Sequence, residues 1–260
     1  MNTAVLASWL LTYLVHSTIL LGATWLISRI LGDRHLALQE ILLRIALVGG
    51  VVTATLQLGL RVEPVGGALA IDVTPTTESV TLAGSGAEGS AVESDARDSH
   101  HRAGPSWPSH FLSFWGIGSL AMLLVLGRSV IDLRRLLKTR RFRPTGRLID
   151  RLSAALGLRR SVRLSTTAAI AVPFATGIRR PEICCPERVG DLASEHRKSL
   201  FAHELAHLAR RDPAWQLMYR IGEAVLCMQP LNRVVRRRLE EIAEHLTDAR
   251  AVACTGDRLG

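Results

Sequence analysis

The chain has 260 residues, of which 48% are hydrophobic and only 5% aromatic, and its net charge is +9. The apolar residues gather in three long runs in the first half of the chain, which excludes a single water-soluble globule. Twelve Lys and Arg residues against two acidic residues lie between Arg128 and Arg163, directly after the third run, so we expect membrane lipids and no direct nucleic acid as partners.

Two membrane helices are predicted within residues 1–60. Residues 4–28 carry no formal charge and are long enough to cross the hydrocarbon core. No basic segment precedes them, as a cleavable signal peptide would require, so we expect a retained helix. Residues 41–60 form the second span, with Arg44 near one end, where it can reach the membrane surface. His16 lies inside the first span and is expected to hydrogen-bond to a neighbouring helix.

Residues 61–110 are rich in Gly, Ser, Thr and acidic residues, and we predict a disordered extracytoplasmic loop there. A third span follows at residues 111–133. The link between the first two spans is basic, whereas the 61–110 loop holds three Arg against seven acidic residues. By the positive-inside rule, the N-terminus and this loop lie outside, and the chain after the third span lies inside. We therefore predict a multi-pass protein of the inner or plasma membrane.

Residues 134–260 are charged and amphipathic, and we predict a cytoplasmic domain that is mainly helical with a small sheet. Pro181 falls within an apolar stretch, and a proline inside a strand points to an edge strand. Cys184, Cys185, Cys227 and Cys254 form no Cys-x-x-Cys pair, so we expect reduced, mostly buried thiols. The predicted elements are a basic helical stretch (134–158, broken at 144–146), a short strand (162–164), the edge strand (178–185), and helices from about 191, over 213–228 and over 232–254.

Residues 201–212 read FAHELAHLARRD and place His203 and His207 one helical turn apart. Positions i and i+4 share one face of a helix, so both imidazoles can bind one zinc ion. Glu204 lies beside them and can polarise a water molecule at the metal. The alternative is a pair of solvated or capping histidines without a metal.

A catalytic zinc ion usually takes three protein ligands, so a third is expected elsewhere in the chain. The segment RRRLEEIAEHLTDARAVA offers Glu240, Glu241, Glu244 and His245. We favour Glu244, because Asp248 follows one helical turn later and can orient a histidine ligand. His245 is rotated about 100° around the helix from Glu244, so the two side chains do not face one metal ion. The alternative for this segment is a solvated charged face.

Three segments together resemble the bacterial membrane zinc metallopeptidases of the beta-lactam sensor-transducer, or antirepressor, type. They read PFATGIRRPEICCPE, HELAHLARRDPAWQL and QPLNRVVRRRLEEIAEHLTDARAVA. The resemblance implies a zincin-like α+β peptidase domain that binds Zn²⁺ through His203, His207 and Glu244, with Glu204 as the general base. It also implies that the predicted edge strand borders the substrate cleft through Gly177, Ile178, Pro181 and Ile183.

The chain departs from this family at two places. Thr247 stands where the family usually has a cysteine, and Cys184 and Cys185 stand where it usually has aliphatic residues. The family usually continues past this point with another membrane helix and sometimes an outer sensor domain. We therefore expect a C-terminally truncated chain and do not infer beta-lactam sensing.

By this resemblance we expect an integral membrane zinc endopeptidase that acts in signal transduction and cleaves a cytoplasmic regulatory protein, such as a transcriptional repressor, or its own chain. One alternative is a housekeeping membrane metalloprotease of the prenyl-protein or heat-shock type, which shares the histidine motif. The other is a signalling receptor with a non-catalytic metal site. The intact Glu204 argues against the receptor, and the strand before the motif and the three spans argue against the housekeeping protease.

Overall fold

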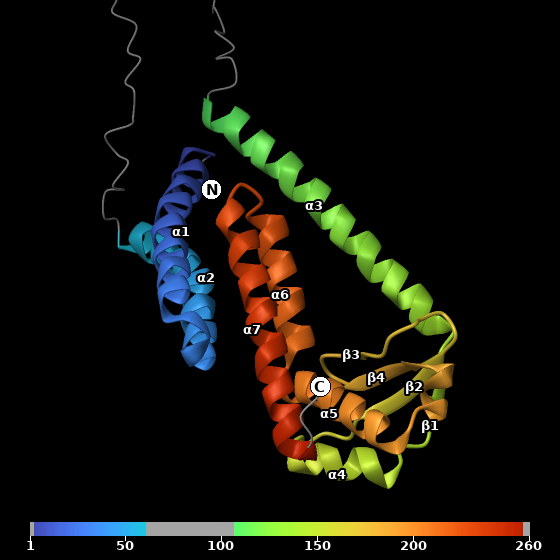
Figure 1. Ribbon diagram of the computed structural model, residues 1–260. Coiled ribbons are helices and arrows are strands. Elements are labelled where there is room, and N and C mark those ends of the chain that lie inside the picture. Colours follow the sequence, from blue (N-terminus) through green and yellow to red (C-terminus); the bar gives the residue numbers. More distant parts are fainter. Residues whose placement is uncertain (1–2, 61–106, 257–260) are drawn as a thin grey trace, which may run out of the picture.

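The computed structural model describes residues 3–60 and 107–256, and three of its helices are long and apolar enough to cross a membrane (Figure 1). They are α1 (Thr3–Leu31), α2 (Leu36–Gly59) and α3 (Trp107–Lys138). Helices thus lie at all three places where spans were predicted. The α3 helix extends beyond the predicted 111–133 at both ends, since the Arg, Leu and Lys residues that follow the apolar run are good helix formers. Residues 61–106 of the predicted loop lie outside the described residues.

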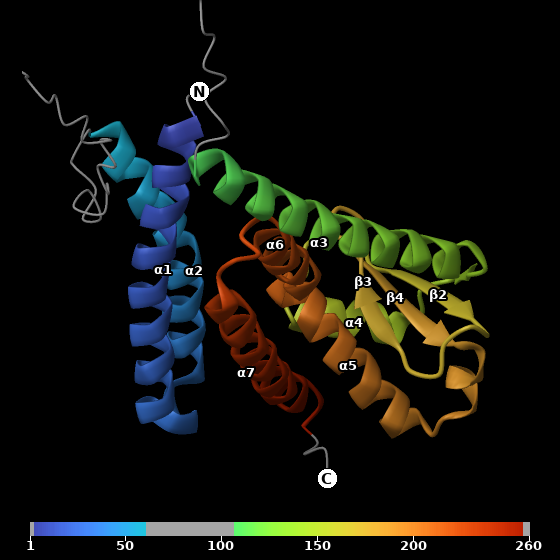
Figure 2. The ribbon, with the colours of Figure 1, turned by 90° about the horizontal axis from the view of Figure 1, so that it is seen from above.

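The first two spans form a close antiparallel hairpin joined by a 3₁₀ turn at Gly32–His35 (Figure 2). A Cβ on Gly50 would lie 2.8 Å from Cβ of Ser17. Only a glycine at position 50 therefore lets the two helix backbones approach this closely. Nδ1 of His16 lies 3.1 Å from Oγ1 of Thr53 across the same interface. The prediction that His16 bonds to a neighbouring helix is confirmed.

Four short strands form one mixed sheet in the order β1-β2-β4-β3. Their bounds are β1 (Arg141–Arg143), β2 (Arg163–Thr167), β3 (Phe174–Thr176) and β4 (Glu182–Pro186). The central strands β2 and β4 are parallel, and β1 and β3 pair with them antiparallel from outside. Residues 141–143 were predicted to be helical, and this was wrong: all three side chains are exposed, so β1 has no apolar alternation to reveal it.

The predicted edge strand over 178–185 was also wrong, because β4 is an inner strand whose Ile183 is fully buried. Pro181 lies just before β4, where its missing N–H costs the sheet no hydrogen bond, and its carbonyl accepts from the Arg163 N–H at 3.0 Å. Gly177, with a φ of 89°, begins the turn that links β3 to β4, and a Cβ there would lie 2.1 Å from the Arg180 carbonyl oxygen. The edge strand on this side of the sheet is β3.

Four further helices complete the described part of the chain. They are α4 (Arg147–Ala155), α5 (Ser194–Arg210), α6 (Asp212–Val225) and α7 (Pro230–Thr255), and a 3₁₀ turn at Glu187–Asp191 precedes α5. The helices predicted from about 191, over 213–228 and over 232–254 correspond to α5, α6 and α7. Arg211, with a φ of 62°, joins α5 to α6 in the left-handed conformation, which costs a non-glycine residue about 1–2 kcal/mol. This turn brings the start of α6 back beside the end of α5.

Two apolar cores hold these elements together. In the first, α5 packs its Phe201 and Leu205 against the sheet, α4 and the end of α7. In the second, Tyr219 of α6 and Leu239 of α7 pack against Leu43 of α2. The α6–α7 hairpin therefore lies between the membrane hairpin and the sheet, and α3 crosses over α6 (Figure 2).

The tip of the α6–α7 hairpin contacts α1 and α3 through polar side chains. Gln229 donates from Nε2 to Oγ of Ser17 on α1 at 2.6 Å, and the indole N–H of Trp115 on α3 donates to the Val225 carbonyl at 2.8 Å. Hydrogen bonds of this kind are typical of contacts between helices in lipid. The elements after the third span thus pack against all three predicted membrane helices.

Candidate metal centre

Helix α5 carries the two histidines. Its apolar residues face the first core, which leaves His203 and His207 on the opposite side, next to α7. Because the two residues are one turn apart, their rings lie side by side, and the two Nε2 atoms are 3.2 Å apart. The structure therefore brings these predicted ligands together.

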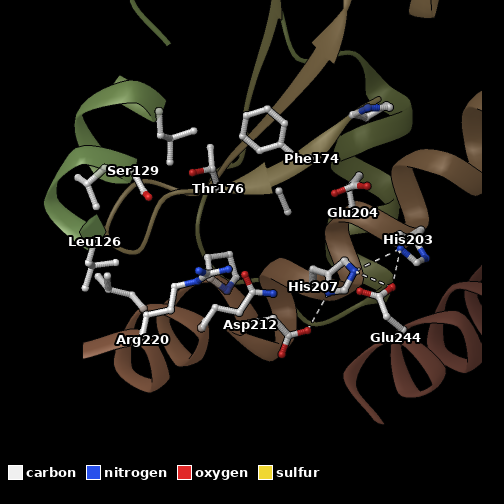
Figure 3. Close-up of a pocket in the computed structure, with 17 residues that line it drawn as sticks. Leu126, Ser129, Phe174, Thr176, His203, Glu204, His207, Asp212, Arg220 and Glu244 are labelled. Carbon is white, nitrogen blue, oxygen red and sulfur yellow. Dashed lines mark hydrogen bonds and ion pairs between the residues drawn. The ribbon is translucent and has the colours of Figure 1, made fainter. Parts of the chain in front are cut away.

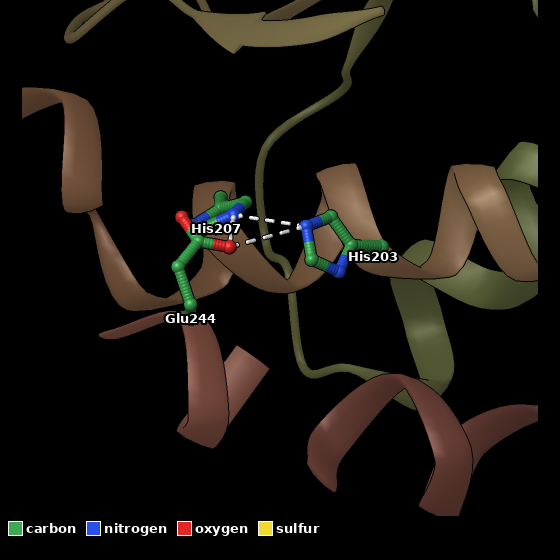
Figure 4. Close-up of side chains that lie close together, drawn as sticks. All are labelled: His203, His207 and Glu244. Carbon is green, nitrogen blue, oxygen red and sulfur yellow. Dashed lines mark hydrogen bonds and ion pairs between the residues drawn. The ribbon is translucent and has the colours of Figure 1, made fainter. Parts of the chain in front are cut away.

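Glu244 of α7 completes the group (Figure 4). Its Oε2 lies 3.6 Å from Nε2 of His203 and 3.6 Å from Nε2 of His207. Two imidazoles and a carboxylate are a ligand set that suits zinc, and four tetrahedral ligands at about 2.0–2.1 Å from a zinc ion lie about 3.3 Å from one another. The three atoms thus have identities and a spacing that fit a zinc ion with one further coordination position for water or substrate.

Each histidine is oriented by a carboxylate on its other ring nitrogen. Oδ1 of Asp248 lies 2.9 Å from Nδ1 of His203, and Oδ2 of Asp212 lies 2.9 Å from Nδ1 of His207. With Nδ1 occupied in this way, both Nε2 atoms are free to face the same point. Burial disfavours the charged form of His207, but its hydrogen bond to Asp212 and the nearby Glu244 outweigh this and raise the pKa of His207.

Asp248 was predicted from the sequence to orient a histidine, whereas the role of Asp212 was not. The helix predicted over 213–228 left Asp212 without a role, whereas α6 begins at Asp212 and the carboxylate of this residue is turned toward His207. An acidic residue shortly after the second histidine, beside a break between helices, was the available signal. Thr247, where the family usually has a cysteine, is buried with its Oγ1 3.4 Å from Nδ1 of His207.

Glu204 lies beside the two histidines and points into the cleft, apart from the three converging ligand atoms (Figure 3). It is buried, and the backbone N–H of Ala175 on β3 donates a hydrogen bond to its carboxylate. Burial raises the pKa of Glu204 above that of an ordinary carboxyl, although the neighbouring histidines and this hydrogen bond act in the opposite direction. An acid in this place can take a proton from a water molecule near the three ligand atoms.

A cleft of about 650 Å³ leads to this centre. One wall is the edge strand β3 with Phe174, Ala175 and Thr176, and the opposite wall comes from α3 and α6, from which Arg220 projects (Figure 3). A second, apolar hollow reaches His203 and Glu204 from the other side, between Val172 and Leu200. The centre is therefore open to an extended chain from two directions.

The four residues predicted to contact substrate do not lie in this cleft. Gly177, Ile178 and Pro181 line a separate hollow beside the start of α6, and Ile183 is buried beneath the sheet. The reason is the change of edge strand: β3 stands between β4 and the metal centre. Instead, Phe174, Ala175 and Thr176 of β3, to which no role was assigned from the sequence, line the cleft.

A family model described as BlaR1 peptidase M56 matches residues 66–258, which include α3, the sheet and all residues of the centre described above. No curated protein matches the chain.

Proposed function

The chain belongs to the BlaR1 peptidase M56 family, and from this we propose that it is an integral membrane zinc endopeptidase. The observation that carries the proposal is the convergence of His203, His207 and Glu244 at the spacing of zinc ligands, with Glu204 beside them. A receptor with a non-catalytic metal site has no use for a buried acid in that position. The family match favours the antirepressor type over the housekeeping alternative.

The chemistry follows from the side chains. A zinc ion held by the three ligands would supply Lewis acidity, which favours attack of water on a peptide carbonyl. Glu204 takes a proton from the water as its oxygen bonds to the carbonyl carbon. The same carboxyl then gives the proton to the amine nitrogen as the C–N bond breaks. Asp212 and Asp248 hold the two imidazoles in place during these steps.

We propose that the substrate binds in an extended form along β3. An edge strand leaves backbone N–H and C=O groups free to pair with an added strand, and Ala175 already directs its N–H toward the centre. On the far side of the cleft, Leu126, Val130 and Leu133 of α3 offer an apolar wall. Since α3 is also a predicted span, a substrate that reaches this cleft is bound close to the membrane surface.

We further propose that the cleft faces the cytoplasm and that the substrate is a cytoplasmic regulatory protein, such as a transcriptional repressor, or the chain itself. The basic cluster after the third span supports this side by the positive-inside rule. The contact between Glu40, near the start of α2, and Arg210, at the end of α5, supports it further, because it places the link between the first two spans on the same side as the metal centre.

The test of the proposed function separates zinc binding from proteolysis. Glu204→Gln keeps the three ligands but removes the group that accepts the proton, so we expect full zinc content and a loss of cleavage of about 10²–10⁴-fold. The chain and this variant are expressed in matched cells, and new protein N-termini are compared by mass spectrometry, with co-expressed cytoplasmic repressors included. Identical sets of N-termini in the two samples would contradict the proposed function.

A further inference from the structure

A network of buried charges links the membrane helix α2 to the metal centre. One oxygen of Glu40, Oε1, accepts from Arg210 of α5 and lies 2.5 Å from Nη2 of Arg44. Arg210 in turn donates from Nε to Oδ2 of Asp212 at 3.1 Å, and this same oxygen lies 2.9 Å from Nδ1 of His207. Side chains in direct contact thus run from α2 to a predicted metal ligand.

The charged side chains of this network are buried from solvent. The side chains of Glu40, Arg210 and Asp212 are 9%, 6% and 4% exposed. Burial disfavours the charged form of Arg210, but Asp212 and Glu40 outweigh this and raise its pKa, so the guanidinium stays charged. Buried charges in such contact are costly to separate, because removing one partner leaves the other unpaired.

We propose that Glu40 is a positioning residue for the metal ligand His207 and acts through Arg210 and Asp212. The planar guanidinium of Arg210 touches both carboxylates at once, so its orientation depends on Glu40 and in turn determines where Oδ2 of Asp212 lies. That oxygen orients the His207 ring. This inference rests on the proposed function, in which His207 binds zinc.

Arg44 links Glu40 to α6. Its Nε donates to the Tyr219 hydroxyl at 3.0 Å, and its guanidinium carbon lies 4.1 Å from the centre of the Trp215 ring. Arg44 was expected to reach the membrane surface, but in the structure its side chain makes these contacts within the protein. Without the Glu40 charge, the guanidinium groups of Arg44 and Arg210 would face each other with no carboxylate between them, and at least one would have to move. The position of α2 therefore sets the orientation of His207.

The experiment measures zinc affinity directly, so that it does not depend on an identified substrate. The full chain is purified in lipid nanodiscs, and zinc is titrated in competition with a chromogenic chelator. We expect Glu40→Gln to weaken zinc binding about 10-fold, at the lower end of the effect that partners of a histidine ligand have. The Co²⁺-substituted protein should also show altered d–d absorption, because the ligand geometry has changed. Arg210→Lys, which keeps the charge but loses the planar group whose Nη2 and Nε contact the two carboxylates, should do the same.

Glu223→Gln is the matched control. Oε1 of Glu223 lies 2.7 Å from Nε of Arg236, their side chains are 12% and 14% exposed, and the pair joins α6 to α7 without contact to the histidines. We expect its zinc affinity and cobalt spectrum to equal those of the unmodified chain. Equal affinities for Glu40→Gln, Arg210→Lys and the unmodified chain would overturn the inference, as would an equal loss in Glu223→Gln. If Glu40→Gln does not fold, Arg210→Lys decides. An unmodified chain that binds no zinc would instead overturn the proposed function.

Discussion

The proposed third zinc ligand is a single residue of α7, Glu244. Glu244 and His245 are adjacent, so their side chains leave the helix about 100° apart. The Glu244 carboxylate lies 3.6 Å from both Nε2 atoms, and Asp248, one turn further on, is bonded to His203. We expect Glu244→Ala to abolish stoichiometric zinc and His245→Ala to leave zinc content and proteolysis unchanged. Elemental analysis of the two purified variants measures this. If His245→Ala were instead the variant without zinc, the ligand would be assigned one residue too early.

The residues of the centre differ in how far sequence alone could place them. His203, Glu204 and His207 follow from the periodicity of one helix. Glu244 was favoured because an acidic residue follows one turn later, but its place beside the two histidines was implied by the family resemblance and not by local spacing. Asp212 could not be placed in this way. Its carboxylate reaches His207 because Arg211 adopts a left-handed conformation, and nothing about an arginine in the sequence signals that conformation.

At the scale of elements, the edge strand β3 is expected to hold the substrate. The N–H of Ala175 points away from β4 toward Glu204, so Ala175→Pro removes a hydrogen-bond donor from the cleft and leaves the pairing of β3 with β4 intact. We expect this variant to bind zinc normally and to cleave about 10- to 100-fold more slowly, because Glu204 loses a hydrogen-bond donor and the edge of β3 loses a group with which a substrate can pair. The measurement is the rate of cleavage of a substrate found by the N-terminal comparison above.

Ala175→Ser is the control for this strand. It enlarges the side chain but keeps the backbone N–H, so we expect nearly unchanged cleavage. If the proline variant also cleaved at the normal rate, backbone pairing along β3 would have no part in binding, and the apolar hollow between Val172 and Leu200 would be the remaining place for the substrate.

The elements show why the sheet was harder to predict than the helices. Long helices such as α5 and α7 carry many turns of apolar periodicity, whereas β1 and β3 have three residues each and too few positions to establish alternation. Pro181 was correctly taken as incompatible with an inner strand, but the strand begins one residue after it. A proline just before a strand and a proline in an edge strand look alike in sequence, and the pairing partner distinguishes them.

At the scale of the whole molecule, the apolar runs predicted three spans, but they could not predict how α6 and α7 pack against them. A helix with one apolar face and one polar face is typical of a domain surface. In the structure the hairpin tip reaches α1, where the Asn232 amide donates to the Tyr13 hydroxyl at 3.1 Å. This contact joins residues from opposite ends of the chain, and local sequence patterns contain no information on such pairs. The helix that carries Glu244 is thereby packed against α1 and α2.

The orientation of the whole molecule can be measured by cysteine labelling, and the structure indicates which native cysteines interfere. Cys184 and Cys185 are fully buried, and burial raises the pKa of the Cys185 thiol to about 12, so it stays protonated and unreactive at neutral pH. Cys227 and Cys254 are partly exposed. Replacing these two with serine should therefore give a chain that a membrane-impermeant maleimide does not label at neutral pH, even in permeabilised cells.

In that background, the positive-inside rule predicts opposite results for two introduced cysteines. Ser90 lies in the acidic segment between the second and third spans, outside the described residues, and Ser194 is the exposed first residue of α5. We expect the maleimide to label Ser90→Cys in intact cells and to label Ser194→Cys only after the cells are permeabilised. The basic residues after the third span favour the cytoplasm, whereas the acidic segment is free to cross the membrane. The reverse pattern would place the metal centre outside the cell, and a cytoplasmic repressor could then not be its substrate.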